Sequence, residues 1–471
     1  MDTATLMVEQ VIDSCARRRD DVAMIHGERH VTGADLVDLV YRMAAALREI
    51  GVSGGRLVVV RAQNSPEVIA LRLATQLSGG CAMIVPAHSN DELITKLAPD
   101  VLVTEPSSPI TGAYTLGESA GCVDLLAMAG DMPATPIRCP ASGDDVSYLT
   151  LSGGTTGHPK ATCHTHTVQK TFAAAISDPR PRLLVVTPLA YLAQNLVDAA
   201  LTAEGLVVLL ESSPEFDPGL VLAAIERHRI TNLFLVEPQL FALATHPELS
   251  RYDVSSLRRL LHLGAAAPPA ARRTALRLLG PVLCHGYGSS EIGLASVLDP
   301  DQYTADRLDT AGPILPETRV RFTGPDGSPG APGEPCDIAV TGPYIASGYW
   351  GRPDLDAAIA DGWISTGDVG FVDDHGDLHI LGRRADIVDN VFPPQVEDLL
   401  YQQPGVRLAS VFADTNQFRA LVVAQPGAEL DPGALMTELQ TGLGVTVTVV
   451  VVDHIPLTEQ GKPDLSAMRK A

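Results

Sequence analysis

Short apolar runs alternate with helix-like segments along most of this chain, and this alternation is the feature that most restricts its fold. One such unit combines an apolar run at 57–60, a helical pattern at 66–76 and a second apolar run at 81–85. The same alternation recurs over 220–244 and over 260–285. Strands that alternate with helices pack as parallel sheets with helices on their faces. The sequence therefore predicts an α/β fold.

The pattern changes toward the C-terminus. From about Asp309, turns rich in Gly and Pro separate short strand-like runs, which indicates a small β subdomain over about 309–382. Beyond Arg383, helical patterns at 394–401 and near 432–443 combine with strand runs, the last at 445–452. We predict a large N-terminal core over residues 1–382 and a small, mobile α+β lid over 383–471.

Composition argues against several classes of partner. The chain has 34 Lys and Arg against 56 Asp and Glu, a net charge of −22, which disfavours nucleic acid and anionic membranes. Seven cysteines without metal-binding spacing favour reduced thiols. The N-terminus lacks the basic and apolar segments of a signal peptide. We expect a soluble, cytoplasmic protein.

The most apolar window, 183–210, does not read as a membrane span. Four polar residues interrupt it: Gln194, Asn195, Asp198 and Glu204. A span needs about 20 predominantly apolar residues in succession. We predict a buried α/β segment here.

A loop rich in glycine and hydroxyl groups follows the strand-like run 146–151. It reads Ser152-Gly153-Gly154-Thr155-Thr156-Gly157-His158-Pro159-Lys160. Glycines let the backbone approach closely and turn through positive φ, so such a loop can surround an oxyanion. It does not fit the Walker pattern of P-loop NTPases. Taken alone, it is also compatible with a surface turn.

Four further motifs follow in a fixed order: Tyr287-Gly288-Ser289-Ser290-Glu291, Ser365-Thr366-Gly367-Asp368, Gly382-Arg383 and Pro456-x-Thr458-x-x-Gly461-Lys462. Their order and spacing, from about residue 20 to 467, resemble the adenylate-forming superfamily of acyl- and aryl-CoA synthetases, peptide-synthetase adenylation domains and luciferases. The motifs are most similar to those of aryl-acid and acyl-CoA ligases. The resemblance implies that ATP activates a carboxylic acid to acyl-AMP, with release of pyrophosphate, before transfer to a thiol of CoA or of an acyl or aryl carrier protein.

The resemblance also implies roles for individual residues. Lys462, Glu291 and Thr155 take the catalytic positions, and Glu291 is the expected Mg²⁺ ligand. Asp368 would accept the ribose hydroxyls with Arg383 beside it. The remaining residues expected to hold ATP are Ser152, Gly153, Gly154, Thr156, Gly157, Lys160, Gly264, Ala265, Ala266, Tyr287, Gly288 and Ser290.

Each of these motifs has a commoner explanation when taken alone. An isolated aromatic such as Tyr287 is more often part of a turn, and Thr-Gly-Asp is a frequent turn sequence. A lone lysine near a C-terminus is usually solvated. What favours a functional interpretation is that all the motifs occur together, in the order and spacing of the family.

The acyl pocket is expected from segments 187–194, 261–267 and 286–294. Its predicted residues are His166, Tyr191, Leu192, Gly286 and Gly293. On a strand, His164 and His166 would share one face, so a metal site is conceivable, but no third ligand is near. The resemblance favours His166 as a pocket wall over a structural histidine.

The resemblance constrains the acid only in part. Leu192 stands where amino-acid-activating relatives carry an aspartate, and an apolar residue cannot pair with a buried ammonium. The glycine pair Gly153-Gly154 is similar to that of aryl-acid ligases and also to that of fatty acyl-CoA synthetases. A His-Asn pair that recognises an ortho-hydroxyl is replaced by Tyr191-Leu192. We predict a neutral aryl acid or a short-to-medium apolar acid.

The chain departs from the family pattern after Arg383. The family's hinge position falls on Ala385, and about four residues are missing, including a glycine that relatives place beside the pantetheine tunnel used after the lid rotates. A true deletion and an unrepresented loop both fit the sequence. The alternative acceptor is therefore an amine or another nitrogen nucleophile. A non-catalytic nucleotide-binding relative is disfavoured because Lys462, Glu291 and Asp368 are all present.

Overall fold

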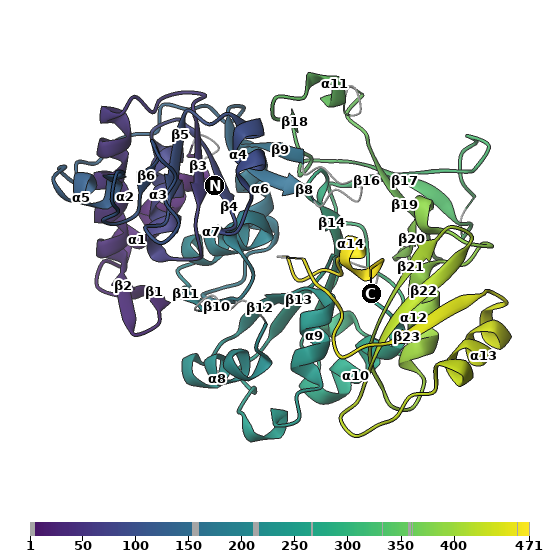
Figure 1. Ribbon diagram of the computed structural model, residues 1–471. Helices are drawn as coiled ribbons and strands as arrows, with labels where there is room; N and C mark the ends of the chain where they lie inside the picture. Colours follow the sequence, from purple (N-terminus) through teal and green to yellow (C-terminus); the bar gives the residue numbers. More distant parts are fainter. Residues whose placement is uncertain are drawn as a thin grey trace.

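The computed structural model describes residues 5–152, 160–210, 216–264, 267–331, 333–356, 359, 361–458 and 460–470. Two eight-stranded sheets dominate its N-terminal part (Figure 1). The inner strands of both sheets pair in parallel, for example Leu57 opposite Cys81, whereas β14 and β15, and β8 and β9, pair antiparallel. The predicted α/β fold class is confirmed.

The strands of the first sheet, in sheet order, are β15 (Gly293–Leu298), β14 (Leu283–Ser289), β13 (Arg259–His262), β12 (Asn232–Leu235), β10 (Arg182–Val185), β11 (Leu206–Leu209), β1 (Val22–His26) and β2 (Arg29–Thr32). Those of the second are β18 (Gly348–Tyr349), β9 (Lys160–Thr165), β8 (Val146–Ser152), β4 (Cys81–Val85), β3 (Leu57–Arg61), β5 (Val101–Thr104), β6 (Tyr114–Thr115) and β7 (Val123–Asp124).

The helices of this part are α1 (Met7–Arg17), α2 (Gly33–Glu49), α3 (Pro66–Leu77), α4 (Asp91–Leu97), α5 (Leu125–Gly130), α6 (His166–Ala175), α7 (Gln194–Thr202), α8 (Pro218–His228), α9 (Glu237–Ala244) and α10 (Pro269–Leu279). Short helical turns lie at Leu189–Ala193, Leu249–Arg251 and Pro300–Gln302. One buried cluster joins residues of α1, α2, α3 and α7 with strands of both sheets, so these helices pack between the two sheets.

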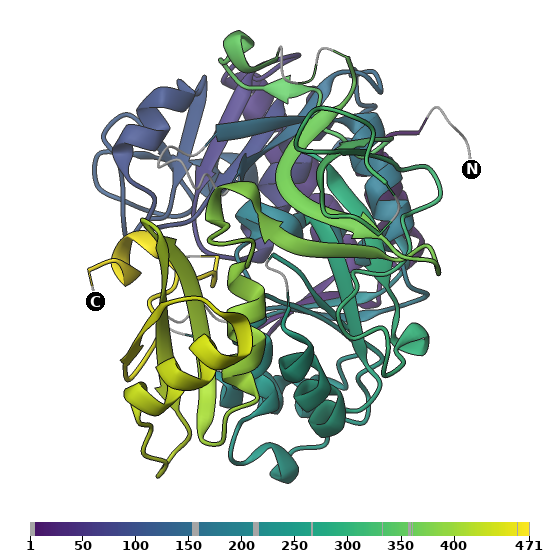
Figure 2. The same cartoon turned by 90° about the vertical axis from the view of Figure 1, so that its right-hand side faces the viewer.

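A four-stranded antiparallel sheet follows, and it contains β16 (Arg319–Thr323), β17 (Cys336–Thr341), β19 (Ile364–Val372) and β20 (Leu378–Arg383), with α11 (Pro353–Asp356) between β18 and β19. A one-turn helix at Arg384–Asp386 leads into the C-terminal part. That part contains β21 (Val406–Asp414), β22 (Gln417–Ala424), β23 (Val447–Val451), α12 (Pro393–Tyr401), α13 (Pro432–Leu443) and α14 (Leu465–Met468). Figure 2 shows this part, in yellow, lying in front of the parallel sheets.

The C-terminal part docks through α12 onto α9 and α10. The backbone N–H of Ala270, in the first turn of α10, donates to the Asp398 carboxylate at 2.8 Å. A carboxylate is favourable there because the N-terminal end of a helix leaves unpaired N–H groups and a partial positive charge. The ring of Tyr401 stacks on that of Phe241 with centroids 5.1 Å apart. These contacts fix where the C-terminal part lies in this structure.

The chain is continuous after Arg383, and residues 388–391 form a tight turn. Val388 and Val391 exchange both backbone hydrogen bonds, at 3.1 and 2.9 Å. Asp389 and Asn390, between them, have φ angles of 48° and 62°. Two central residues with positive φ form the most compact hairpin connection, and Asp and Asn tolerate that conformation best among non-glycine residues. The short loop is therefore a complete structural unit.

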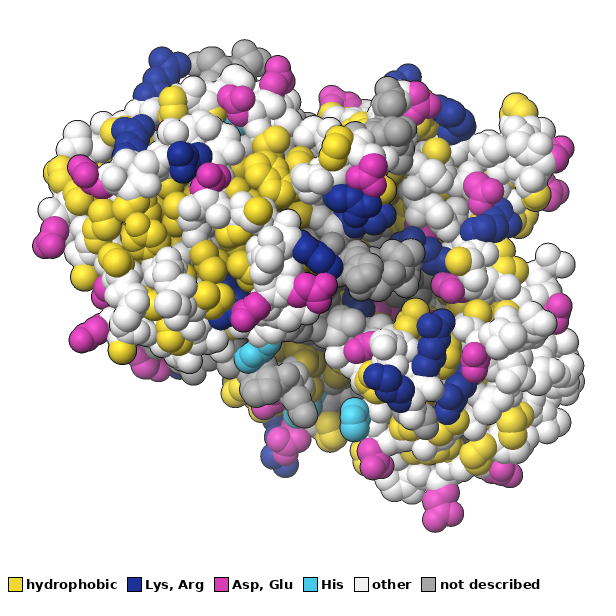
Figure 3. Space-filling model, turned by 45° about the horizontal axis from the view of Figure 1, so that its top comes forward, with side chains coloured by type: hydrophobic (Ala, Val, Ile, Leu, Met, Phe, Trp, Pro, Cys, Tyr) yellow, Lys and Arg dark blue, Asp and Glu magenta, His cyan; other side chains and the backbone are white. Residues whose placement is uncertain are grey.

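The surface and the thiols agree with the composition. Figure 3 shows Lys and Arg side chains interspersed with Asp and Glu over one face, which is hollowed between the N- and C-terminal parts. None of the seven cysteines, all of which lie among the described residues, forms a disulfide, and six of them are buried. Among the described residues, no helix combines the length and the apolar character required to cross a bilayer.

A buried ion pair joins the helices between the two sheets. Arg72 of α3 and Asp198 of α7 are 1% and 0% exposed, and Arg72 Nη1 donates to Asp198 Oδ2 at 2.9 Å. Gln169 Nε2 of α6 donates to the same oxygen at 2.8 Å. Because two charges are taken out of water together, each needs its partner to remain charged.

We predict that Arg72→Met lowers the free energy of unfolding by about 3–5 kcal/mol, because it leaves the Asp198 carboxylate buried without its counter-charge. Urea denaturation followed by circular dichroism measures this loss. The matched control is Arg227→Met, which breaks an ion pair with Glu28 whose side chains are 60% and 85% exposed. We expect the control to cost less than about 1 kcal/mol. Equal losses for the two variants would contradict the prediction.

Candidate active site

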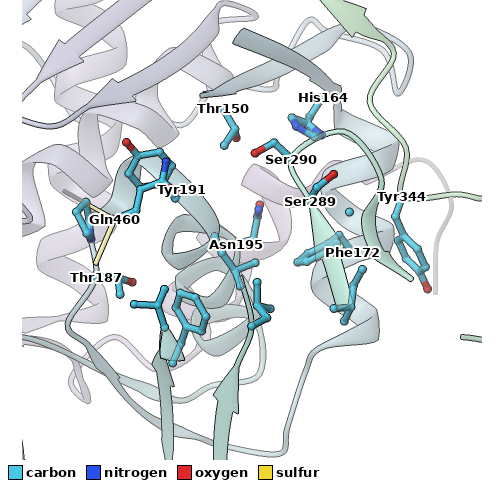
Figure 4. A pocket seen from close by; sticks show the side chains of 18 of the residues that line it. Thr150, His164, Phe172, Thr187, Tyr191, Asn195, Ser289, Ser290, Tyr344 and Gln460 are labelled. Carbon is cyan, nitrogen blue, oxygen red and sulfur yellow. The ribbon is translucent and has the colours of Figure 1, made fainter. Parts of the chain in front are cut away.

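A largely apolar cavity of about 130 Å³ lies between the two parallel sheets and the C-terminal part (Figure 4). It opens where strands of the first sheet end and where the last residues of the chain approach the core. Its apolar walls come from α6, the turn before α7, β12, β15 and the residues after β12 and β13. The side chains concerned are Phe172, Leu192, Phe234, Val236, Leu263 and Leu294.

The turn that leads into α7 is held in place from the neighbouring sheet. Asn64 Nδ2 donates to the Thr187 carbonyl at 3.0 Å, and the Leu189 N–H donates to Asn64 Oδ1 at 2.9 Å. This clamp positions Tyr191 and Leu192, which both line the cavity. A single buried asparagine thus fixes the backbone of the predicted pocket segment.

One wall of the cavity is polar. Tyr148 and Thr150 of β8, His164 of β9 and Asn195 of α7 all line it. The rings of Tyr148 and His164 stack with centroids 4.7 Å apart. Burial lowers the pKa of His164 to about 4, so its ring is neutral at neutral pH.

Tyr287, Asp368 and Arg383 meet beside the cavity, although they are far apart in the sequence. Tyr287 Oη donates to Asp368 Oδ2 at 2.6 Å, and Arg383 Nε lies 2.9 Å from Asp368 Oδ1. Asp368 and Arg383 are opposite each other on the antiparallel strands β19 and β20, which explains their contact. Burial raises the pKa of Asp368, and the Arg383 guanidinium opposes that shift.

Two of these residues lie within strands. Ligands in parallel sheets usually bind at loops that follow strands, but Tyr287 lies within β14 and Asp368 within β19. Gly288 explains why the first motif stays in a strand. A Cβ on Gly288 would lie 2.1 Å from the Gly293 carbonyl oxygen, so only glycine permits β15 to pair this closely.

Glu291 follows this strand and faces the same region. Ser289 Oγ donates to Glu291 Oε2 at 2.9 Å, which orients the carboxylate. Ser290 Oγ donates to the Leu151 carbonyl at 3.1 Å and so ties this turn to the end of β8. Among the described residues, no group of three or more His, Cys, Asp or Glu side chains could hold a metal ion. A lone carboxylate fits Mg²⁺ that takes its other ligands from phosphates and water.

Lys462 reaches the cavity from a tight turn near the C-terminus. The Thr458 N–H donates to the Lys462 carbonyl at 2.7 Å, and the Gly461 N–H donates to the Thr458 carbonyl at 2.8 Å. Lys462 lines the cavity and packs on Gly264, where a Cβ would lie only 2.8 Å from Lys462 Cε. Burial, and to a lesser extent Arg383, lowers the pKa of Lys462, while Glu291 opposes the shift.

Part of the predicted nucleotide site lies outside the described residues. This applies to Gly153, Gly154, Thr155, Thr156 and Gly157, to Ala265 and Ala266, and to the side chain of Ser152. Lys160 is described and begins β9, with its ammonium 5.6 Å from the centre of the Tyr349 ring.

Two predicted pocket residues differ from the structure. His166 begins α6 and is fully buried, and it does not line the cavity, whereas His164 does. The expectation that both share one strand face fails because the strand ends at Thr165. Gly286 lies behind the cavity wall, where a Cβ would meet Leu294 and Leu263. The predicted pocket residue Gly293 does line the cavity.

Sequence reasoning missed the polar wall. Asn195, Tyr148, Thr150 and His164 were not predicted as pocket residues. For Asn195 a signal existed, because it interrupts the most apolar window of the chain. A polar residue inside a buried segment needs a partner or a function.

Comparison with known proteins shows a family. Residues 11–350 match the model of the AMP-binding enzyme family. The chain is 32% identical to a feruloyl-CoA synthase of an Amycolatopsis species, over 93% of this chain and 94% of the relative. It is 31% identical to a salicylyl-CoA synthase / salicylate adenylyltransferase of a Streptomyces species, over 96% and 90%. The solved structure of amide bond synthetase McbA from Marinactinospora thermotolerans superimposes with a TM-score of 0.87, at 33% identity and 98% coverage of both chains.

The position of Lys462 depends on Gly461, and this gives a prediction. Gly461 has φ +78°, and a Cβ there would lie 2.8 Å from Val236 Cγ2 and 2.9 Å from Gln239 Nε2. We expect Gly461→Ala to push the turn off the core and to lower the ATP–pyrophosphate exchange expected from the sequence by about 10²-fold. Initial rates of exchange measure this effect.

The control for Gly461→Ala is Gly427→Ala in the same part of the chain. Gly427 has φ +79°, but a Cβ there would meet nothing within 4 Å. Both variants therefore carry similar backbone strain, and only Gly461→Ala collides with the core. A similar loss of exchange in both would attribute the effect to strain and contradict the prediction.

Proposed function

This chain belongs to the AMP-binding enzyme family, within the adenylate-forming superfamily, and from that premise we propose that it activates a carboxylic acid with ATP and transfers the acyl group to a thiol. The intermediate is acyl-AMP, and pyrophosphate is released. The thiol belongs to CoA or to the phosphopantetheine of a carrier protein. The observation that carries this proposal is Lys462, which lines the same cavity as Ser289 and Ser290 of the hairpin that bears Tyr287 and Glu291.

The proposed roles follow from the charges of these groups. Lys462 would contact the carboxylate and the α-phosphate, where negative charge accumulates during adenylation. Asp368 would accept the ribose hydroxyls with its two carboxylate oxygens, and Tyr287 would stack on adenine. Glu291 would hold Mg²⁺, which offsets the charge of the phosphates. The glycine-rich loop 152–160 would surround the phosphates of ATP.

The cavity supports an aryl acid. Its walls combine the aromatic rings of Phe172 and Phe234 with aliphatic side chains. A cavity of about 130 Å³ is close in size to the roughly 150 Å³ apolar cavity that accommodates benzene in an engineered protein. A single aromatic ring would fill it better than a long acyl chain.

Domain motion and location belong to the same proposal. We propose that residues 1–382 form the core and residues 383–471 a lid that rotates between the two half-reactions. Rotation would move Lys462 away from the cavity, since its turn belongs to the lid. A cytoplasmic location would fit seven cysteines that form no disulfide in the described structure.

The role of Lys462 is testable by substitution. We expect Lys462→Ala to lower acyl-AMP formation by about 10²–10³-fold, because a positioned charge is lost from the transition state, while ATP binding persists. Pyrophosphate exchange measures the first effect and calorimetric titration of ATP the second. Lys96→Ala is the control, since Lys96 is 57% exposed and pairs with Glu92 on its own helix. Unchanged exchange in Lys462→Ala would overturn the mechanism.

An amine acceptor is the second candidate, and a specific observation favours it. The segment after Arg383 is closed by the two-residue turn at Asp389 and Asn390, where the family pattern has a longer loop with a glycine beside the thiol channel. The similarity to an amide bond synthetase points in the same direction. In this candidate function, adenylation is unchanged and a nitrogen nucleophile attacks the acyl-AMP.

One experiment separates the two acceptors. Pyrophosphate exchange with a panel of aryl, fatty and amino acids first identifies the acid, and CoA or a panel of amines is then added to the best substrate. We expect a CoA thioester, detected by mass spectrometry. An amide formed in its place, with no thioester from CoA or from a phosphopantetheinylated carrier protein, would reject the thiol acceptor and establish the nitrogen acceptor.

A further inference from the structure

Asn195 places a hydrogen-bond acceptor in the wall of the cavity. The residue is 7% exposed, and its Oδ1 has no hydrogen-bond partner among the residues that the structure describes. Figure 4 shows the amide end of Asn195 directed into the space between Tyr191 and Ser290. A buried acceptor left unpaired costs about 1–3 kcal/mol, so such an atom calls for a partner that arrives with a ligand.

The orientation of this amide is set by its neighbours. The Asn195 side chain hydrogen-bonds to the phenol of Tyr148, a contact that lowers the phenol's pKa while burial raises it. An amide N–H that serves the phenol leaves the carbonyl oxygen for the cavity. Three residues further along α7, Asp198 is held by Arg72 and Gln169. The helix that carries Asn195 is therefore fixed in rotation.

His164 supplies a second acceptor on the same wall. Thr162 Oγ1 donates its only proton to the Thr150 carbonyl at 3.0 Å, and His164 Nε2 lies 3.1 Å from that hydroxyl oxygen. Nε2 must therefore carry the proton and donate to Thr162. Since the ring is neutral, Nδ1 is then an acceptor.

Three hydroxyl donors near this wall are already used. Ser290 donates to the Leu151 carbonyl, Ser289 to Glu291 and Thr162 to the Thr150 carbonyl. None of these three hydroxyls can therefore donate to Asn195 or His164 as well. An acid with only hydrocarbon beyond its carboxylate would bring no hydrogen-bond donor to either acceptor and would keep water away from them.

We propose that the acid is an aryl acid whose ring carries an N–H or O–H donor, and that Asn195 is the residue that selects it. This inference rests on the proposed adenylation, and it narrows the substrate from neutral aryl or apolar acids to donor-bearing ones. The donor pairs with Asn195 Oδ1, and His164 Nδ1 is available to a second donor on the same ring.

The test compares isosteric acids in ATP–pyrophosphate exchange. Hydroxybenzoic and aminobenzoic acids are paired with the methylbenzoic acids of the same substitution pattern, because a methyl group has a similar size and cannot donate. For the preferred pattern, we expect kcat/KM to be about 10- to 100-fold higher for the donor-bearing acid, as the loss of one buried hydrogen bond implies. Equal values within each pair, or a preference for fluoro- over hydroxy- and aminobenzoates, would overturn the proposal.

Two variants assign the preference to its residue. Asn195→Leu has a similar volume and no acceptor, and we expect it to reduce the ratio within each pair to less than about 3-fold. Phe172→Leu reshapes an apolar wall without touching the acceptors, so it should lower both members of a pair and preserve their ratio. An unchanged ratio in Asn195→Leu would remove Asn195 from the proposal.

The outcomes keep this inference separate from the proposed function. Exchange with no acid in the panel, donor-bearing or not, would refute adenylation itself. Exchange with methylbenzoic acids as strong as with their hydroxy and amino partners would retain adenylation and refute the donor requirement. The wild-type comparison stands by itself if Asn195→Leu fails to fold.

Discussion

The buried ion pair between Arg72 and Asp198 is the interaction on which the rest of the site depends. It joins α3 to α7 between the two parallel sheets, and Gln169 of α6 adds a further hydrogen bond to the same carboxylate. Desolvated charges are stable only when their hydrogen bonds are complete, so this network permits little rotation of α7. Asn195 lies three residues before Asp198 and hence on the same side of the helix. The direction in which the cavity's polar wall points is therefore set by a contact outside the cavity.

Docking of the C-terminal part has a comparable effect on Lys462. Asp398 caps α10, Tyr401 stacks on Phe241 of α9, and Gly461 lies against Val236 just before α9. The contacts of Tyr401 and Gly461 reach α9 and the residue before it, and α9 follows β12, whose Phe234 lines the cavity. A lysine on a flexible stem loses considerable conformational entropy when it is ordered. Here the aromatic and capping contacts of the interface together offset that entropy cost. The proposed lid motion would break all of these contacts at once.

The sequence predicted local elements better than it predicted the environment of each side chain. The apolar run 81–85 and the helix 432–443 agree with the structure at both ends, because burial pattern and Pro or Gly boundaries are local signals. The contact of Asp368 with Arg383 depends on strand register, which no local pattern reveals. His166 was misplaced for a similar reason, since a helix begins exactly where a continued strand would have kept it beside His164. In the sequence, Asn195 could be recognised only as a polar interruption of an apolar window. Its role became apparent only from its position in the cavity wall.

The acid and its acceptor make separate demands on this fold. In the proposed function, acid selection would depend on α7, β8 and β9, which lie within the packed core, whereas the acceptor would approach past the segment after Arg383. There Val388 and Val391 pair directly around a two-residue turn, so the turn contains no further residues that could line a long channel. A phosphopantetheine arm would use more of such a channel than a small amine would. The amine acceptor of the second candidate function would therefore require a change in this turn alone, with the cavity, Lys462 and the acyl-adenylate chemistry preserved.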